Sequence, residues 1–384
     1  MTATMCLYNL LLILGIARLT FFGSSVCNGQ GASEDGSIKH GYAWQYGQLM
    51  DARHAADSTV GMYEYRNTSV NGINTIRHLS MLDSHVPVDT GGFVVIGLGL
   101  GNEGLHEATD KQAVYDQWKT NMMRIIRRAE ERSKAVVVTN NYPRGDYNAT
   151  DYRYVKAMNL EMHEWDVPTV NFLGALDNCA GNGQWASGYQ NGDDIYHPSE
   201  AGHAELMHAI VPSLFDALAA NKAKPTRQTG DGITLAENQC IIFAPEDEVH
   251  AFTLALRVKN IGALNLTMTL TSGVAPVMPT LPTDADWHTL VITHYYAAGR
   301  TYVYLDGELQ RATDGRLLLS KVVLSGPCSV SDLHFWRSGM NDGEVAAFQA
   351  GKMLCSSLEL YCPLNNGNTA NLAQSTNTIR LIRQ

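Results

Sequence analysis

The sequence predicts an α/β fold, a three-layer α/β/α sandwich with a mainly parallel sheet, followed by a C-terminal antiparallel β-sandwich. In the first part of the chain, continuous apolar runs alternate with stretches of helical periodicity, which is typical of strands buried on both faces of a parallel sheet. After a polar stretch at residues 220–232, short runs of alternating polarity are separated by turn signals. That second pattern is typical of an antiparallel sandwich.

Apolar runs mark the candidate strands of the parallel sheet. They are Leu19–Gly23, Gly92–Gly99, Ala135–Val138 and Pro168–Leu173. The first two end in glycine, which favours a turn at that point. Because the carboxyl ends of parallel strands meet at one edge of the sheet, we expect the ligand site beyond that edge.

Helices are predicted between and after these strands. Apolar residues from Val114 to Ala129 recur at spacings of three and four, which gives one apolar face opposite a charged, solvated one. A weaker pattern predicts a helix over residues 154–165. The segment that follows Pro198 predicts one helix that continues to Leu218.

The chain divides into four parts by composition. We expect an apolar N-terminal segment at residues 1–17, the α/β domain at 18–219, a linker at 220–232 and the β-sandwich domain at 233–384. The predicted strands of the sandwich are Phe252–Val258, Leu264–Leu270, Trp287–Thr293 and Thr301–Leu305, with a tight turn at Asp306-Gly307.

Charge and composition exclude some functions. The net charge is −10, and no basic run exceeds a few residues, so nucleic acid is a poor candidate partner. The seven cysteines lack the C-x-x-C pairs of a zinc site. Their odd number fits a reducing compartment, or three disulfides with one cysteine left over, and it assigns no pairing.

The N-terminus has two interpretations. The apolar stretch from Leu7 to Ala17 is too short to span a membrane and has the length of a signal-peptide core, but it lacks a basic leader. It could instead be a buried helix or an extension of the first strand. Sequons at Asn67, Asn148 and Asn265 are compatible with secretion. We expect a secreted protein, with a cytoplasmic one as the alternative.

A serine, a histidine and an aspartate occupy positions suited to nucleophilic acyl transfer. Ser24 and Ser25 follow the glycine that ends the first strand, and Asp194 stands three residues before His197. On the residues alone, either serine could attack. The turn-forming segment 71–74 can offer a backbone N–H to an oxyanion, and Asn102 can offer its side-chain amide.

Neighbouring residues compete for these roles. Asp193 could replace Asp194, although the three-residue spacing favours Asp194. His203 is expected to be structural or exposed, and His106 could line the pocket. Cys27 is expected to be packed rather than catalytic, because no cysteine–histidine motif accompanies it.

Residues 18–219 resemble the SGNH (GDSL-like) hydrolases in the order of their motifs. The family's first block matches Gly23-Ser24-Ser25 followed by Gly29, its second block Gly72, its third Asn102-Glu103, and its last Asp194-x-x-His197. The resemblance implies a flavodoxin-like SGNH fold. It also implies that Ser25 is the nucleophile, with His197 as base, oriented by Asp194. The amides of Ser25 and Gly72 and the side chain of Asn102 would form the oxyanion hole, without metal or organic cofactor.

Two positions depart from the family's pattern. Ser24 stands where the family has aspartate, and so does Glu103. Neither position is the nucleophile, the base or an oxyanion donor. We expect both departures to change local hydrogen bonding.

Residues 233–375 resemble a concanavalin A-like (laminin-G-type) jelly roll. The resemblance rests on Trp287–Ile292, Gly299–Gly307 and Phe335–Val345. Such modules often bind glycans, although many only pack against a neighbouring domain. We expect Trp287 and Trp336 in the core, and no acidic pair indicates a glycosidase site.

Together these observations predict a serine esterase that removes O-acyl (acetyl) groups from carbohydrate, with a non-catalytic, lectin-like second domain. Its expected partners are a small-molecule or glycan ester, with no nucleic acid and no membrane span. A lipid or general short-chain esterase is one alternative. A non-enzymatic glycan-binding protein with a degenerate hydrolase domain is the other, and it would explain Ser24 and Glu103.

Overall fold

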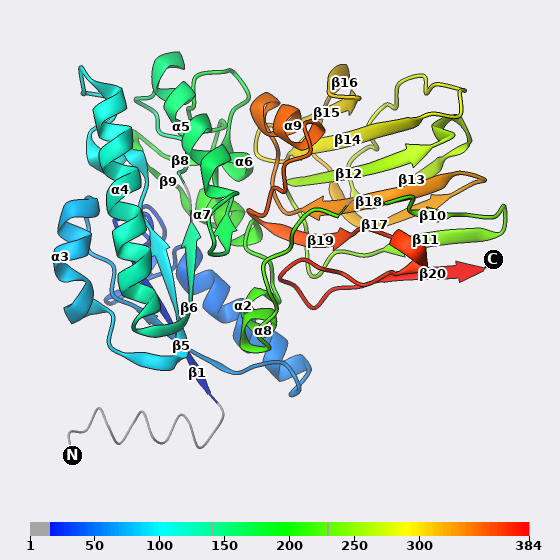
Figure 1. The fold of residues 1–384 in the computed structure, drawn as a ribbon. Coiled ribbons are helices and arrows are strands. Elements are labelled where there is room, and N and C mark those ends of the chain that lie inside the picture. The colour runs from blue at the N-terminus through cyan, green and yellow to red at the C-terminus, as the bar shows by residue number, and fades with distance from the viewer. Residues whose placement is uncertain (1–15, 140, 229, 384) are drawn as a thin grey trace.

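A computed structural model describes residues 16–139, 141–228 and 230–383 of the chain (Figure 1). Of the apolar segment predicted at residues 1–17, residues 1–15 lie outside the described part of the chain. Within the described residues, no helix is both long and apolar enough to cross a membrane.

A five-stranded sheet with the order β4-β1-β5-β6-β7 forms the centre of the first part of the chain. Its strands are β1 (Ala17–Gly23), β4 (Tyr63–Asn67), β5 (Asp89–Gly97), β6 (Ser133–Thr139) and β7 (Thr169–Val170), and every neighbouring pair is parallel. The polar strand β4 was not predicted, because its sequence, Tyr-Glu-Tyr-Arg-Asn, contains no apolar run.

Helices cover both faces of this sheet and complete the predicted three-layer α/β/α sandwich. On one face lie α2 (Tyr42–Ala56), α7 (Glu200–His208) and α8 (Leu214–Ala219). On the other lie α3 (Thr75–His85), α4 (Lys111–Glu130) and α5 (Ala149–Met162). The neighbours Phe21 and Phe22 belong to opposite cores, as the alternation of side chains along a strand requires.

Two predicted elements are shorter than expected. The helix predicted from Pro198 to Leu218 is divided into α7 and α8, and Pro212, which has no backbone N–H to donate, lies in the break. The predicted strand Pro168–Leu173 is reduced to the two residues of β7. The chain then turns into the short helix α6 (Leu173–Leu176).

The remainder of the chain forms two antiparallel sheets that enclose an apolar core, consistent with the predicted β-sandwich. Their strands are β10 (Ile233–Thr234), β11 (Gln239–Phe243), β12 (Phe252–Lys259), β13 (Asn265–Ser272), β14 (Trp287–Tyr295), β15 (Arg300–Leu305), β16 (Glu308–Asp314), β17 (Leu318–Ser325), β18 (Ser329–Trp336), β19 (Leu358–Cys362) and β20 (Ile379–Arg383). Helix α9 (Asp342–Gln349) packs on the outer face of the larger sheet. Trp336 is fully buried as expected, whereas Trp287 is half-buried beneath the Arg257 guanidinium.

The sandwich covers the open edge of the parallel sheet. Ser357 N donates to Thr169 O at 2.9 Å, and Asn171 N donates to Ser357 Oγ at 2.9 Å. Gly339 N donates to Gly174 O at 3.1 Å. The first of these bonds satisfies a backbone group of the edge strand β7, and the other two satisfy groups of the segment that follows it. The two parts of the chain therefore share a hydrogen-bonded interface.

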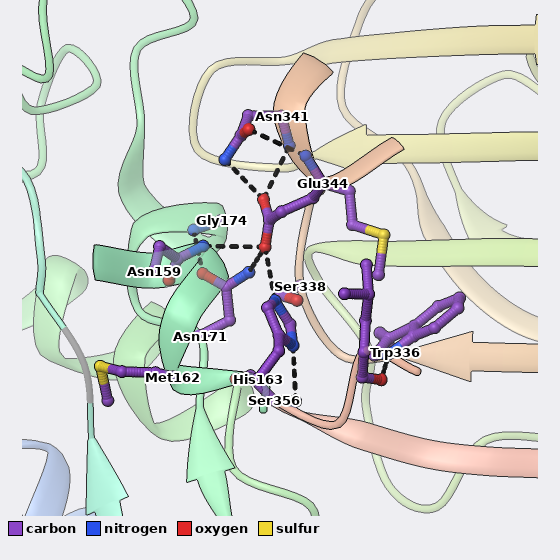
Figure 2. A network of polar contacts seen from close by, with 12 residues as sticks. Asn159, Met162, His163, Asn171, Gly174, Trp336, Ser338, Asn341, Glu344 and Ser356 are labelled. Atoms are coloured by element: carbon purple, nitrogen blue, oxygen red, sulfur yellow. Dashed lines mark hydrogen bonds and ion pairs between the residues drawn. The ribbon is translucent and has the colours of Figure 1, made fainter. Parts of the chain in front are cut away.

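The Glu344 carboxylate of α9 is the centre of a buried polar network in this interface (Figure 2). Its Oε1 lies 2.8 Å from Asn159 Nδ2, 2.8 Å from His163 Nε2 and 2.9 Å from Asn171 Nδ2, all from the first part of the chain. Its Oε2 accepts from Asn341 N at 2.9 Å and from Asn341 Nδ2 at 2.6 Å. This number of donors offsets the cost of burying a carboxylate.

Glu344→Ala is expected to lower the free energy of unfolding by about 3 kcal/mol, because it leaves buried donors on both sides of the interface without an acceptor. Urea unfolding measures the effect. Glu308→Ala, at an exposed position of β16, is the matched control and should stay within about 0.5 kcal/mol of wild type. Equal effects of the two substitutions would contradict this account of the interface.

Candidate active site

Ser25 lies at the carboxyl edge of the parallel sheet, two residues after β1 ends. A Cβ atom on Gly23 would lie 2.3 Å from Gly97 O and 2.7 Å from Cys27 Cβ, so only glycine fits where β1 meets the end of β5. Beyond Gly23 the chain makes a helical turn, in which Asn28 N donates to Ser24 O at 2.9 Å. This turn leaves Ser25 half-buried at the mouth of a cavity.

His197 and Asp194 come from a hairpin of β8 (Gln190–Asn191) and β9 (Asp194–Pro198). His197 Nε2 lies 2.8 Å from Ser25 Oγ, and His197 Nδ1 lies 2.7 Å from Asp194 Oδ2. If Nδ1 carries the proton and donates it to Asp194, Nε2 is free to accept the proton of the serine hydroxyl. Asp194 Oδ1 accepts from Tyr196 N at 3.1 Å, which holds the carboxylate in place, while the neighbouring Asp193 is exposed.

Gly72 and Asn102 reach the same cavity from two other loops. Gly72 has a φ of +72°, a conformation that favours glycine. Asn102 Nδ2 donates to Ser24 Oγ at 2.7 Å, and the Ser24 side chain is buried. An amide nitrogen carries two hydrogens, so one remains for an oxyanion. Four of the five predicted site residues thus line one cavity, and the fifth, Asp194, contacts His197 behind it. Their catalytic roles stay predictions.

Glu103 connects the loop of Asn102 to the loop of Gly72. Its Oε1 accepts from Thr75 N at 2.6 Å and its Oε2 from Thr75 Oγ1 at 3.0 Å. Thr75 is the first residue of α3, directly after the Gly72 turn, so the carboxylate lies at a helix N-terminus, where negative charge is favourable. Burial raises the pKa of Glu103, and the bonds from Thr75 oppose that shift.

The cavity has a volume of about 490 Å³, and sequence reasoning did not predict several residues of its wall. Besides the predicted site residues, it is lined by Gln30, Asn71, Tyr142, Arg144 and Tyr196. A signal for two of them was present, because Tyr142 and Arg144 closely follow β6, whose carboxyl end lies at the ligand-binding edge of the sheet. Tyr196 stands between Asp194 and His197 in the predicted motif itself.

The competing residues have structural roles. Cys27 is buried, which raises the pKa of its thiol to about 11 and makes it a poor nucleophile, in agreement with the predicted packing role. His106 does not line the cavity: its Nδ1 lies 2.7 Å from Asp151 Oδ2. His203 is fully buried rather than exposed.

Among the described residues, His208, Glu248 and His250 form a group with the composition of a metal site. Both nitrogens of His250 already contact carboxylates, with Nδ1 2.9 Å from Glu205 Oε2 and Nε2 2.8 Å from Glu248 Oε1. The rings of His208 and His250 stack with centroids 3.9 Å apart, so their in-plane lone pairs do not converge on one point. This group fits a hydrogen-bonded ion cluster better than a cation site.

One family model covers the part of the chain that carries these motifs. Residues 21–205 match the GDSL-like Lipase/Acylhydrolase family. The acetylxylan esterase Axe2 from Geobacillus stearothermophilus is similar in structure, at 16% identity and a TM-score of 0.39 over 50% of this chain and 91% of that one. The lipase Lip_vut3 from a goat rumen metagenome has 15% identity and a TM-score of 0.39 over 50% of this chain and 95% of its own. No curated protein matches by sequence.

Ser24→Ala is expected to lower kcat by up to about tenfold, because it removes one hydrogen bond, worth about 1 kcal/mol, that orients the Asn102 amide. Steady-state hydrolysis of a simple ester measures the effect. Ser24→Thr keeps an acceptor oxygen and is the conservative control, expected to retain more activity than the alanine variant. If Ser24→Ala abolished activity as completely as Ser25→Ala does, Ser24 would have more than this orienting role.

The environment of His203 predicts a pH dependence of stability. Its Nδ1 accepts from Tyr42 N at 3.2 Å and its Nε2 lies 3.0 Å from Gln30 O, so the neutral ring fits both partners. Burial lowers the pKa of His203 from 6.5 to about 4. The unfolded chain therefore takes up this proton at a higher pH than the folded one, and the stability present above pH 6.5 is lost as the pH falls toward 4.

With His203 replaced by Gln, the unfolding free energy should fall less steeply as the pH is lowered below 6.5. The difference from wild type should be up to about 1.4 kcal/mol per pH unit. Urea unfolding at several pH values between 7.5 and 4.5 checks this, with wild type as reference. If the unfolding free energies of the two proteins changed equally with pH, the pKa of His203 would be the same in the folded and the unfolded chain.

Proposed function

We propose that this chain, whose residues 21–205 form a GDSL-like ester-bond hydrolase domain, is a serine esterase with Ser25 as its nucleophile. The observation that carries the proposal is the continuous hydrogen-bonded line from Ser25 Oγ through the His197 ring to Asp194. It opens into a cavity that also presents Gly72 and Asn102. This is the arrangement that activates a weak hydroxyl nucleophile next to oxyanion donors.

In the proposed reaction, His197 Nε2 takes the proton of Ser25 as Oγ bonds to the ester carbonyl carbon. The tetrahedral intermediate collapses when the bond to the alcohol oxygen breaks, and His197 gives its proton to the leaving alcohol. Water then attacks the acyl-enzyme with His197 again as base, which releases the acid and restores Ser25. Asp194 keeps the imidazole in the required tautomer. These steps use no metal and no organic cofactor.

The negative oxygen of each tetrahedral intermediate is proposed to lie among the backbone N–H groups of Ser25 and Gly72 and the free N–H of Asn102. Ser24 and Glu103 support this set indirectly, because Ser24 orients Asn102 and Glu103 holds the start of α3 next to the Gly72 turn. These bonding roles argue against a degenerate site, the alternative that the two departures had suggested.

The proposed substrate is an O-acyl group, such as acetyl, on carbohydrate. The cavity wall has amide, guanidinium and phenol groups, and no aliphatic side chain is among its described lining residues. Tyr196 is 47% exposed, and the face of its ring that Arg144 does not cover could stack on a sugar. A lipid esterase would need an apolar acyl pocket, so the wall favours a carbohydrate ester. Glycan binding by the β-sandwich is part of the same proposal and rests on its lectin-like resemblance.

Ser25→Ala is expected to lower the rate of acetate release from acetylated oligosaccharides by about 10⁴-fold or more, because loss of a triad nucleophile removes the covalent route. Release of acetate, followed by an enzyme-coupled assay, is the measurement. Ser80→Ala, on the exposed side of α3, is the matched control and should behave as wild type. Activity retained in Ser25→Ala would refute the proposed nucleophile, and a preference for long acyl chains would favour a lipid esterase.

A further inference from the structure

Among the described residues, the wall of the Ser25 cavity has a permanently charged group of only one sign. Among the described residues that line it, Arg144 is a permanent cation and none is a carboxylate. The chain as a whole has a net charge of −10, so a cation at this position runs against the overall charge. Arg144 is paired with Asp146 and also lines the cavity, where its remaining donors favour a ligand that carries negative charge.

The amide side chains of the wall are oriented as donors. Asn71 Oδ1 accepts from Asn28 Nδ2 at 2.8 Å, and Gln30 Oε1 accepts from Lys39 Nζ at 3.0 Å. Each of these oxygens already accepts one bond within the chain, whereas the NH₂ groups of Asn71 and Gln30 are left to donate to a ligand. Together with Arg144, these groups favour a ligand that brings acceptors.

The guanidinium of Arg144 is built into the wall rather than placed on the surface. Arg144 is only 8% exposed, and its Cζ lies 4.6 Å from the centroid of the Tyr196 ring. A Cβ atom on Gly101 would lie 2.1 Å from Arg144 Nη1. Gly101 has no positive φ, so its lack of a side chain serves the close approach of the guanidinium, directly beside Asn102.

Asp146, the ion-pair partner of Arg144, uses only part of the hydrogen-bonding capacity of the Arg144 guanidinium. Arg144 Nη2 donates to Asp146 Oδ2 at 2.7 Å, whereas Arg144 Nε and Asp146 Oδ1 are both buried without a hydrogen-bond partner among the described residues. The pair is thus held by one bond, although guanidinium and carboxylate can form two parallel bonds. Arg144 forms no other side-chain hydrogen bond with the described residues, so the remaining hydrogens of Nη1 and Nη2 are the donors that it can offer to a ligand in the cavity.

We propose that Arg144 binds a carboxylate of the substrate, so that this esterase removes acyl groups from acidic carbohydrate, such as an O-acetylated uronic acid. The carboxylate would be held by Arg144 and the amides of Asn71 and Gln30, while the ester carbonyl lies at Ser25 on the same wall. This inference rests on the proposed esterase function, which it deepens by naming the substrate class.

The test compares two substrates that differ at one group: an O-acetylated uronate glycoside and its primary amide, which is neutral and replaces one acceptor oxygen by an NH₂ donor. Wild type should deacetylate the acid with a kcat/KM about 10- to 100-fold above that of the amide, the range expected for a hydrogen bond to a charged group. In Arg144→Gln this ratio should fall to about 1, mainly through a higher KM for the acid. Because each ratio is taken within one protein, a general loss of activity cancels.

Two further variants make the outcome specific. Asp146→Asn removes the competing carboxylate and should preserve or increase the preference for the acid. Arg311→Gln removes an exposed charge on β16 and should keep the wild-type ratio. The proposal is overturned if wild type does not prefer the acid. It is also overturned if Arg144→Gln loses activity on both substrates equally, since Arg144 would then only position the Asn102 loop.

Binding separates this inference from the esterase function. Calorimetric titration of Ser25→Ala with the acetylated uronate should give a Kd about 10-fold or more below that for the amide, and Arg144→Gln in the same background should abolish the difference. If wild type hydrolysed neither ester but this binding difference were found, the esterase function would fail while the carboxylate site stood. Equal Kd values for acid and amide would overturn the site.

Discussion

The close approach of β1 and β5 at their carboxyl ends is the constraint on which the site depends. Gly23 and Gly97 face each other there, and a Cβ atom on Gly97 would lie 2.9 Å from Cys27 Cβ. Because neither strand end carries a side chain, the turn after β1 packs its Cys27 against the sheet and directs Ser25 toward His197. A larger residue at either glycine would displace the turn, and with it the serine oxygen.

Hydrogen bonds between loops then fix what this turn presents. Ser24 accepts from Asn102, and Glu103 accepts from Thr75. These hydrogen bonds join three segments that are distant in the sequence and fix their relative positions. The β-sandwich adds stability from outside the site, because it covers the edge of β7 and buries Glu344 among donors of the first part of the chain (Figure 2). On the side of the nucleophile, the site is therefore held by hydrogen bonds before a substrate binds, as preorganised catalysis requires.

The sequence predicted the elements that are determined by the pattern of neighbouring residues. Continuous apolar runs located β1, β5 and β6, and the resemblance to the SGNH hydrolases implied that Asp194 orients His197, which lies within hydrogen-bond distance of it. It did not predict the polar strand β4, the division of the last helix of the α/β domain, or Arg144 in the cavity wall. Those features depend on tertiary contacts: β4 is ordered by pairing with β1, and Arg144 by space left at Gly101. The roles of Ser24 and Glu103 were likewise invisible, because their partners lie far away in sequence.

The position of a covalent label tests directly whether Ser25 is the nucleophile. A fluorophosphonate probe reacts with an activated serine, and peptide mass spectrometry of the labelled protein identifies the modified oxygen. We expect the label on Ser25, and we expect Ser24→Ala to be labelled and Ser25→Ala not. Labelling of Ser24, equal labelling of Ser25→Ala, or an unlabelled wild type would contradict this expectation.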